Sequence, residues 1–260
     1  MNPIYTTTRK SFLGGAALLA ATALMPQTAS ASLCIGTCGT LGPDGDVTSS
    51  PQGGDYDFVT TDGGIVGAPN LGVGGETNGS VFQTDIFSAM AGDLLDFYFN
   101  FVTADGSSEF SDYAWARLLN PDLTESALLF TARTVTIGST VPGFGLPAIS
   151  ATITPASADI IDNATDWSPL GSDSGTCFDL GCGSTGWIRS EFEIASAGNY
   201  LLEFGVTNIS DDVVNTGLAY DGITVGGEPI EPPSDVPAPA TLALFGLGLA
   251  GLGWKRRKKA

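Results

Sequence analysis

The sequence predicts an all-β sandwich flanked by two terminal segments that lie outside the fold. Between residues 40 and 230 there is no long apolar pattern with the 3.6-residue period of a helix, whereas runs that alternate apolar and polar residues are frequent. Clusters of Gly, Pro, Asn and Asp separate these runs. Many short strands joined by turns of this kind are typical of a β-sandwich.

The clearest predicted strand is LLDFYFNFV, residues 94–102. Its apolar side chains at Leu95, Phe97, Phe99 and Phe101 share one face, and the residues between them share the other. Seven further segments show strand character, and they are 56–60, 80–87, 114–119, 127–137, 187–194, 200–207 and 218–225. Residues 33–55 and 138–186 contain few such runs, so we expect long loops there.

Residues 1–31 have the three parts of a secretory signal peptide. Arg9 and Lys10 form the positive region, residues 12–24 are apolar, and Ala29 and Ala31 supply small residues before a cleavage site. The alternative is a buried helix or a membrane anchor, but the apolar stretch is short for a span. We therefore expect the mature chain to begin at Ser32 and residues 32–228 to form one exported domain.

The C-terminal end predicts a membrane segment. A Pro-rich linker at residues 229–239 precedes an uncharged apolar segment at 240–254, and a basic tail follows at 255–260. A helix over 240–254 would rise about 22 Å, less than the roughly 30 Å hydrocarbon core, and snorkelling with local thinning could close the gap. A basic tail stays in the cytoplasm, which places the body outside the membrane.

The order of these features resembles the PEP-CTERM sorting signal of Gram-negative bacteria. The motif residues are Val236, Pro237, Ala238 and Pro239, and Ala238 stands where the family name gives Glu. The resemblance implies recognition by an exosortase, a membrane transpeptidase, and removal of the tail. The alternative is an ordinary single-span anchor. Both interpretations place the body outside the cytoplasmic membrane.

Segments of the body resemble the secreted β-sandwich domains, including choice-of-anchor types, that carry such tails. The segments that carry this resemblance are FSAMAGD (87–93), DYAWARL (112–118), GNYLLEFGVTN (198–208) and GLAYDGITV (217–225). The similarity covers roughly residues 55–226. It implies a jelly-roll-like sandwich that is similar in outline to carbohydrate-binding modules.

The charge distribution excludes several function classes. All 28 acidic residues lie between Asp44 and Asp235, where only Arg117, Arg133 and Arg189 oppose them, so nucleic acid is excluded as a partner. The chain has no His, which removes Ser-His-Asp and Cys-His nucleophile systems. No motif of catalytic residues stands out, and we expect a protein without enzymatic activity or cofactor.

The four cysteines occur as two close pairs, Cys34 with Cys38 and Cys177 with Cys182. An exported protein meets an oxidising compartment, so disulfides are the expected state. Three connectivities are possible, and we favour the two local pairs because each lies in a Gly-rich segment. A zinc site with four thiolate ligands is the alternative, and export disfavours it.

Acidic turns and aromatic residues are the remaining candidates for ligand binding. Acid pairs such as Asp44 with Asp46 and Asp211 with Asp212 could bind Ca²⁺, although Asp is also common in turns. The segment beginning at Asp105 starts like a calcium loop but lacks its later ligands. Among the aromatic side chains, Trp167 lies in a predicted loop and is the best candidate for exposure and sugar stacking, whereas the others are expected in the core.

Two function classes follow. The first is a non-enzymatic surface or matrix protein that associates with extracellular polysaccharide. The second is a secreted carbohydrate-active hydrolase whose pair of catalytic carboxylates the sequence does not identify.

Overall fold

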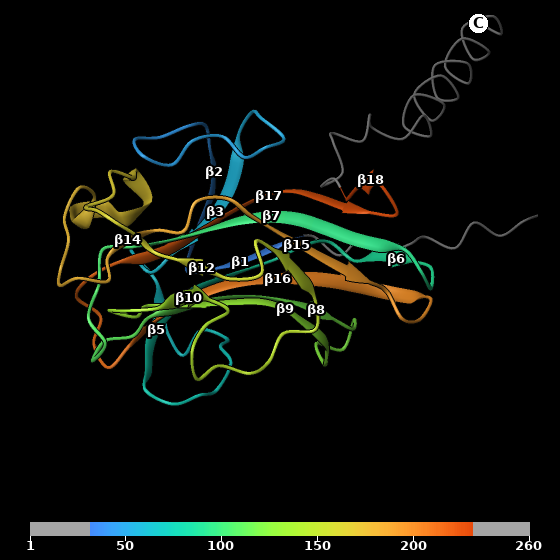
Figure 1. Cartoon of the computed structure of the whole chain (residues 1–260). Helices are drawn as coiled ribbons and strands as arrows, with labels where there is room; N and C mark the ends of the chain where they lie inside the picture. Colours follow the sequence, from blue (N-terminus) through green and yellow to red (C-terminus); the bar gives the residue numbers. More distant parts are fainter. Residues whose placement is uncertain (1–31, 231–260) are drawn as a thin grey trace, which may run out of the picture.

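The alternating segment at residues 94–102 forms the long central strand β7 (Leu94–Thr103) of a two-sheet protein. The computed structural model describes residues 32–230. Its strands form two layers that face each other, with β7 and β17 in one layer and β16, β8 and β9 in the other (Figure 1). All pairings between named strands are antiparallel. The all-β sandwich predicted from the sequence is therefore confirmed.

The seven-stranded sheet is built around β16. Its spatial order is β1 (Leu33–Ile35), β5 (Glu76–Gln83), β16 (Gly198–Ile209), β8 (Tyr113–Leu119) and β9 (Glu125–Arg133), while β4 (Ile65–Val66) pairs with β5 and β6 (Phe87–Ala89) pairs with β16.

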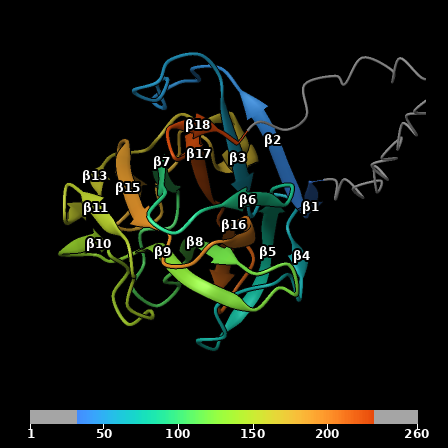
Figure 2. The same cartoon turned by 90° about the vertical axis from the view of Figure 1, so that its right-hand side faces the viewer.

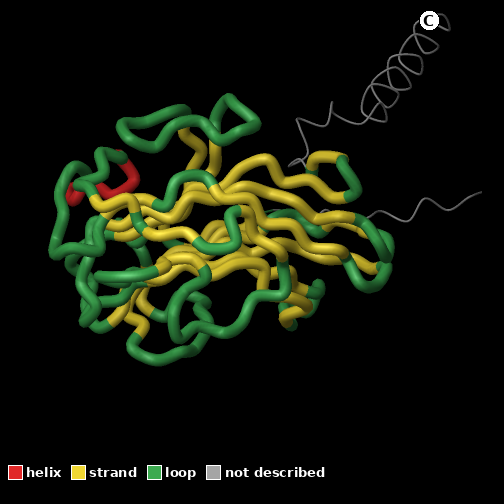
Figure 3. The backbone as a smooth tube through the Cα atoms, viewed as in Figure 1, coloured by secondary structure: helices red, strands yellow, loops and turns green. Residues whose placement is uncertain are grey.

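The nine-stranded sheet is built around β7 and β17. Its spatial order is β11 (Thr152–Thr154), β15 (Ile188–Glu193), β7, β17 (Thr216–Val225), β3 (Tyr56–Thr60) and β2 (Thr37–Leu41). The short strands β13 (Ile161–Asp162), β14 (Gly183–Ser184) and β18 (Glu228–Pro229) extend it. A separate pair is formed by β10 (Ser139–Val141) and β12 (Ala158–Asp159), and the one helical segment among residues 32–230 is the 3₁₀ helix η1 (Ser168–Asp173) (Figure 3).

Aromatic side chains from both sheets fill the space between them. Phe97, Phe99 and Phe101 point inward from β7 and are fully buried, as the alternation predicts. Phe99 stacks on Phe130 of the facing sheet with ring centroids 3.8 Å apart, and Phe204 stacks on Tyr220 at 3.9 Å. Burying a side chain of this size contributes about 1.5–3 kcal/mol, so these contacts are a main source of stability.

Each predicted strand overlaps a strand of the structure, and two of them extend past it by more than one residue. The segment predicted at 80–87 is split into β5 and β6, because Thr84 interrupts the ladder: its Oγ1 accepts a hydrogen bond from the Leu202 amide at 2.9 Å. The segment predicted at 127–137 ends as a strand at Arg133. Beyond it the chain turns away to line a pocket.

The prediction of long loops is wrong at residues 33–41 and needs refinement at 138–186. Residues 33–35 and 37–41 form β1 and β2, which are the outer strands of different sheets (Figure 2). Gly36 lies between them with φ +82°, and a Cβ at this position would collide with Ser80. Only a glycine can make this turn, and it lets the chain pass from one sheet to the other.

Residues 138–186 contain five strands, each two or three residues long, and η1.

The terminal predictions fall outside the described residues. These are the signal peptide at 1–31, most of the linker and motif at 229–239, the apolar segment at 240–254 and the basic tail at 255–260. Within residues 32–230, none of the helical structure has the length and apolar character that crossing a membrane requires.

Candidate functional site

The three arginines of the body have different partners. Arg117 Nε donates to Glu203 at 2.6 Å, and Arg189 Nε donates to Asp96 at 2.9 Å. Arg133 forms no salt bridge with any residue in the range 32–230. Its Nε donates to the Ser111 carbonyl at 3.1 Å and its Nη1 to the Phe144 carbonyl at 3.3 Å. Arg133 is thus a cation held by backbone oxygens rather than neutralised by a carboxylate.

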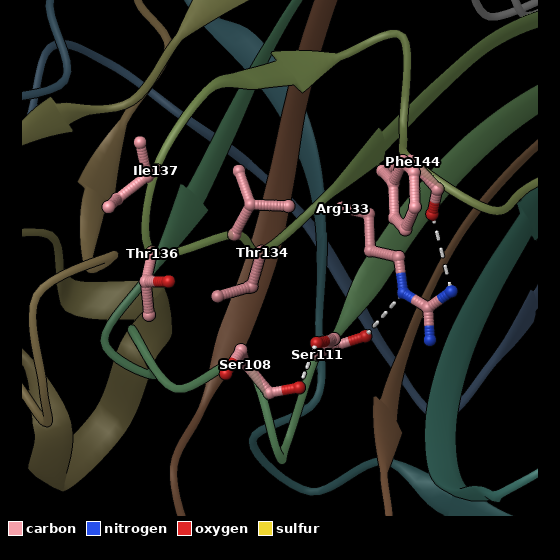
Figure 4. Close-up of a pocket in the computed structure, with 8 residues that line it drawn as sticks. Ser108, Ser111, Arg133, Thr134, Thr136, Ile137 and Phe144 are labelled. Atoms are coloured by element: carbon pink, nitrogen blue, oxygen red, sulfur yellow. Dashed lines mark hydrogen bonds between the residues drawn. The ribbon is translucent and has the colours of Figure 1, made fainter.

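Arg133 lies in an open pocket of about 370 Å³, a volume within the range of small-ligand sites. Two segments form it: the loop before β8, and the end of β9 with the chain that follows it (Figure 4). The lining residues combine hydroxyl, apolar and cationic side chains, and they are Ser108, Ser111, Arg133, Thr134, Val135, Thr136, Ile137 and Phe144. We call this the Arg133 pocket.

Two large apolar side chains of the Arg133 pocket face solvent. Phe144 is 78% exposed and Ile137 is 92% exposed. Phe144 sits between two glycines, and Gly145 adopts φ +71°, a left-handed conformation that glycine accommodates without strain. The Gly143 amide donates to the Thr131 carbonyl at 3.0 Å, which fixes the start of this turn against β9. The backbone of the turn is thus held while the aromatic ring remains free to contact a ligand.

Below the Arg133 pocket, polar residues close one end of the sandwich core. Each of these residues is fully buried and continues the inward-facing row of side chains of its strand. In line with strands of the seven-stranded sheet are Asp112 (β8), Thr134 (β9) and Asn208 (β16). In line with strands of the nine-stranded sheet are Thr103 and Asp105 (β7) and Thr216 (β17). We call these six residues the polar layer. Thr134 belongs to both the layer and the pocket lining, so the two adjoin.

The carboxyl groups of the polar layer have raised pKa values. Burial raises the pKa of Asp112 well above its ordinary value, against the lowering effect of hydrogen bonds from Thr216 and Ile209. Burial also raises the pKa of Asp105 to about 6, and the nearby negative charges of Asp211 and Asp179 add to this. Burial therefore disfavours the charged form of both carboxyl groups, and keeping them ionised would require a compensating positive charge.

The cysteines are paired as the sequence led us to favour. Cys34 and Cys38 form a disulfide with their Cα atoms 6.1 Å apart, and it joins the edge strands β1 and β2 of the two sheets. Cys177 and Cys182 form the second, with Cα atoms 5.6 Å apart. This second loop pairs with the segment around Asp105, because the Phe178 amide donates to the Ala104 carbonyl at 2.8 Å and the Gly181 amide donates to the Gly106 carbonyl at 3.0 Å.

The prediction that Trp167 is exposed is wrong. Its side chain is 0% exposed, and its Nε1 donates to the Tyr56 hydroxyl at 2.9 Å. A Cβ on Gly217 would lie 2.5 Å from the indole ring, so the missing side chain at Gly217 makes room for it. Trp167 enters a small core cluster beside η1, and a buried ring cannot stack on a sugar. Tyr113, Trp115 and Tyr220 are buried, as expected for core residues, whereas Tyr98 and Trp187 are only partly buried.

The acidic turn at Asp44 and Asp46 holds a distant loop through backbone amides. Asp44 accepts a hydrogen bond from the Ser168 amide at 2.7 Å, and Asp46 accepts one from the Asp166 amide at 2.8 Å. Over residues 32–230, no three His, Cys, Asp or Glu side chains gather in a way that could hold a metal ion. The sorting motif Val236, Pro237, Ala238 and Pro239 lies outside the described residues.

Comparison with known protein families gives a match at the C-terminal end. Residues 235–258 match the model of the PEP-CTERM protein-sorting motif. The protein carries a PEP-CTERM sorting signal. The PEP-CTERM match confirms the motif at the place where the sequence indicated it, and it implies processing by exosortase, a membrane transpeptidase. This PEP-CTERM protein is accordingly an exported protein of the cell envelope that exosortase sorts.

The other comparisons concern the whole chain. No curated protein matches it. Among solved structures, the chain is similar to the enzymatically active domain of tailspike protein 4 from bacteriophage CBA120, with a TM-score of 0.31 and 10% sequence identity. The alignment covers 75% of this PEP-CTERM protein and 18% of the tailspike chain, so this protein spans about a fifth of that length.

The sequence analysis did not identify Arg133 and Phe144 as site residues. The sequence could have indicated Arg133, because it is one of only three basic residues in the acidic body. Phe144, between two glycines in PGFG, is a large apolar residue in a turn, where burial is not expected.

Proposed function

We propose that this protein is a non-enzymatic component of the cell envelope or extracellular matrix that binds polysaccharide through the Arg133 pocket. In this proposal residues 1–31 direct export, and residues 240–254 hold the chain in the membrane until exosortase acts on the motif. The Cys pairs form in the oxidising compartment that export implies.

The order of the strands supports a jelly roll as the architecture of the body. The eight principal strands form two groups of four, β3-β17-β7-β15 and β5-β16-β8-β9. Consecutive strands such as β15, β16 and β17 alternate between the sheets. Two interleaved Greek keys in a double sheet have this arrangement, and the jelly roll is common among lectin domains.

The observation that carries the proposal is the composition of the Arg133 pocket. Sugars present hydroxyl groups at their edges and C–H groups on their faces. Arg133 and the hydroxyls of Ser108 and Thr136 supply donors and acceptors for the edges. Phe144, which is exposed at the rim, supplies an apolar surface for a face of the ring.

The charge of the body favours a polysaccharide with few acidic groups. The chain has 28 acidic residues, and the body opposes them with three arginines, two of which are already paired. A polyanion would be repelled by this field, whereas a neutral polysaccharide is not. We therefore propose neutral or weakly charged polymers as the ligands.

The lining of the pocket supports a binding role over the alternative of a hydrolase. Most glycoside hydrolases use two carboxyl groups placed on either side of the scissile bond. No Asp or Glu lines the Arg133 pocket among the residues that the structure describes. The buried carboxyl of Asp112, which follows the lining residue Ser111, already accepts hydrogen bonds from Thr216 and from the Ile209 amide.

Replacing Phe144 by Ala should weaken polysaccharide binding by about tenfold, equivalent to ~1.4 kcal/mol, because the variant loses the stacking surface. The ring is exposed and its backbone contact to Arg133 does not depend on the side chain, so folding should be unchanged. The measurement is binding of the exported protein to an array of neutral and acidic polysaccharides, followed by titration with the best ligand.

The matched control is Phe178→Ala, which removes an exposed Phe outside the pocket lining. It should bind like the wild type. Equal binding by wild type and Phe144→Ala would contradict a role for the pocket. Release of reducing sugar from a bound polymer would favour the hydrolase alternative instead.

A further inference from the structure

The polar layer contains an unusual concentration of unsatisfied groups. Within residues 32–230, six buried side-chain nitrogen and oxygen atoms lack a hydrogen-bond partner, and four of them belong to this layer. They are Asp105 Oδ2, Thr134 Oγ1, and both Oδ1 and Nδ2 of Asn208. A buried polar atom without a partner costs about 1–3 kcal/mol, so atoms of this kind normally have a partner such as an ion or an ordered water.

Strand register brings the residues of the polar layer together. Thr207 pairs with Tyr113 across β16 and β8, which places the next residues along, Asn208 and Asp112, beside each other on the inward face. The Ile209 amide donates to Asp112 Oδ1 at 2.9 Å, which confirms this proximity. On the other side of Asp112, the Thr134 amide donates to the Asp112 carbonyl at 2.9 Å.

The facing sheet brings Asp105 to the same place through a chain of hydroxyl contacts. Thr216 Oγ1 donates to Asp112 Oδ2 at 2.6 Å and lies 2.7 Å from Thr103 Oγ1. Thr103 Oγ1 in turn contacts the Asp105 carbonyl at 2.9 Å. One carboxylate oxygen of Asp105 accepts from the Ser107 amide at 2.9 Å, and the other is the one left without a partner.

These atoms have the chemistry of a site for a hard cation. Ca²⁺ prefers oxygen ligands from carboxylates, amide side chains and backbone carbonyls, and it accepts irregular arrangements of them. Mg²⁺ requires a near-ideal octahedron and gives up its waters reluctantly, which suits an enclosed protein site less well. The layer presents two carboxylates with no basic side chain among its members, so a divalent cation would offset their charge.

We propose that the polar layer binds one Ca²⁺ ion, with the carboxylates of Asp105 and Asp112 and the side-chain oxygen of Asn208 as its ligands. The Thr134 hydroxyl is a fourth available oxygen. Because Thr134 also lines the Arg133 pocket, the ion would lie beneath the pocket and join the loop at 105–112 to the ends of β9 and β16.

The second disulfide supports this assignment by fixing the loop that holds Asp105. The Gly106 amide donates to the Phe178 carbonyl at 2.6 Å, inside the Cys177–Cys182 loop. A Cβ on Gly106 would collide with the backbone of Gly181 and Cys182, so the two segments are in close contact. Asp105 is therefore held in place by the fold whether or not an ion is bound.

The test is calorimetric titration of the exported protein with CaCl₂ in 0.15 M NaCl, together with thermal unfolding in Ca²⁺ and in EDTA. We expect one tight site per chain, and a Tm higher by roughly 5–10 °C at a Ca²⁺ concentration about 100 times the dissociation constant. Wild-type protein with no such site and an unchanged Tm in EDTA would overturn the proposal, and the layer would then contain water or protonated carboxyl groups.

The decisive variant is Asp105→Asn, which keeps the shape of the side chain and removes its charge. Loss of a ligand should weaken Ca²⁺ binding by at least about tenfold, since changes to outer partners of metal sites already cost this much. In Ca²⁺ the wild type should melt above Asp105→Asn. In EDTA the variant should melt above the wild type, because it no longer buries an unpaired carboxylate.

The matched control is Asp122→Asn, the same change on an exposed aspartate in the turn between β8 and β9. It should leave the tight site and both Tm values unchanged. Equal weakening of Ca²⁺ binding by Asp105→Asn and Asp122→Asn would contradict the assignment, because diffuse attraction of Ca²⁺ to an acidic surface would then explain the binding.

Discussion

Deleting residues 254–260 should leave the protein unprocessed and absent from the envelope fraction. The deletion removes the basic cluster at residues 255–259, which marks the cytoplasmic side of a membrane segment, and it truncates the sorting motif at 235–258. Retention and processing should both fall close to zero, since an apolar segment without its basic end has no cytoplasmic anchor. The measurement is the intact mass of envelope-associated and secreted protein.

Cells without exosortase provide the control for the tail deletion. There the full-length chain should keep its tail, whereas in normal cells the tail should be absent from the mature protein. A tail present in every mature molecule, with or without exosortase, would contradict processing and identify the C-terminus as a permanent single-span anchor.

Replacing Glu203 by Ala should destabilise the fold by about 3–5 kcal/mol, a large share of the 5–15 kcal/mol typical of a domain. Glu203 is 1% exposed, and it accepts hydrogen bonds from Arg117 Nε at 2.6 Å, Gln83 Nε2 at 2.8 Å and Trp115 Nε1 at 3.1 Å. The substitution leaves all three donors without this acceptor, in a place that water reaches poorly. Thermal unfolding should show a fall in Tm of roughly 10 °C or more.

Two further variants separate the causes of the Glu203 effect. Glu203→Gln keeps the shape and one acceptor oxygen, and the Gln83 amide can turn to offer its own oxygen, so the loss should be smaller. Glu125→Ala removes the second carboxylate near Arg117, which is 3.8 Å away with its side chain 45% exposed. It should cost about 1 kcal/mol or less. A Glu203→Ala variant no less stable than Glu125→Ala would show that the buried acceptor is unimportant.

The strands of the core could be predicted because their pattern is local. Phe97, Phe99 and Phe101 alternate with polar residues, and short apolar runs bounded by turn residues mark the other long strands. The edge strands β1 and β2 were missed because they are half-exposed and rich in Gly, Thr and Cys, so alternation is weak there. Their positions depend on a turn at Gly36 that passes between the sheets.

The candidate site could not be predicted in the same way, because contacts far apart in the sequence build it. The Arg133 pocket needs the loop around Ser108 to meet the chain that leads to Phe144. The polar layer needs Asp105, Asp112 and Asn208 to reach the same end of the sandwich. Trp167 failed as a prediction for the same reason, since the space that buries it is left by Gly217, fifty residues later.

The direction of β17 determines how the molecule would be presented at the cell surface. This strand begins at Thr216, in the polar layer beneath the Arg133 pocket, and ends at Val225, next to β18. Its ten residues span about 30 Å, so the described chain leaves the sandwich at the end opposite the pocket (Figure 1). A body attached through its C-terminal side would thus hold the Arg133 pocket on the side facing away from the membrane, where polymer chains could reach it.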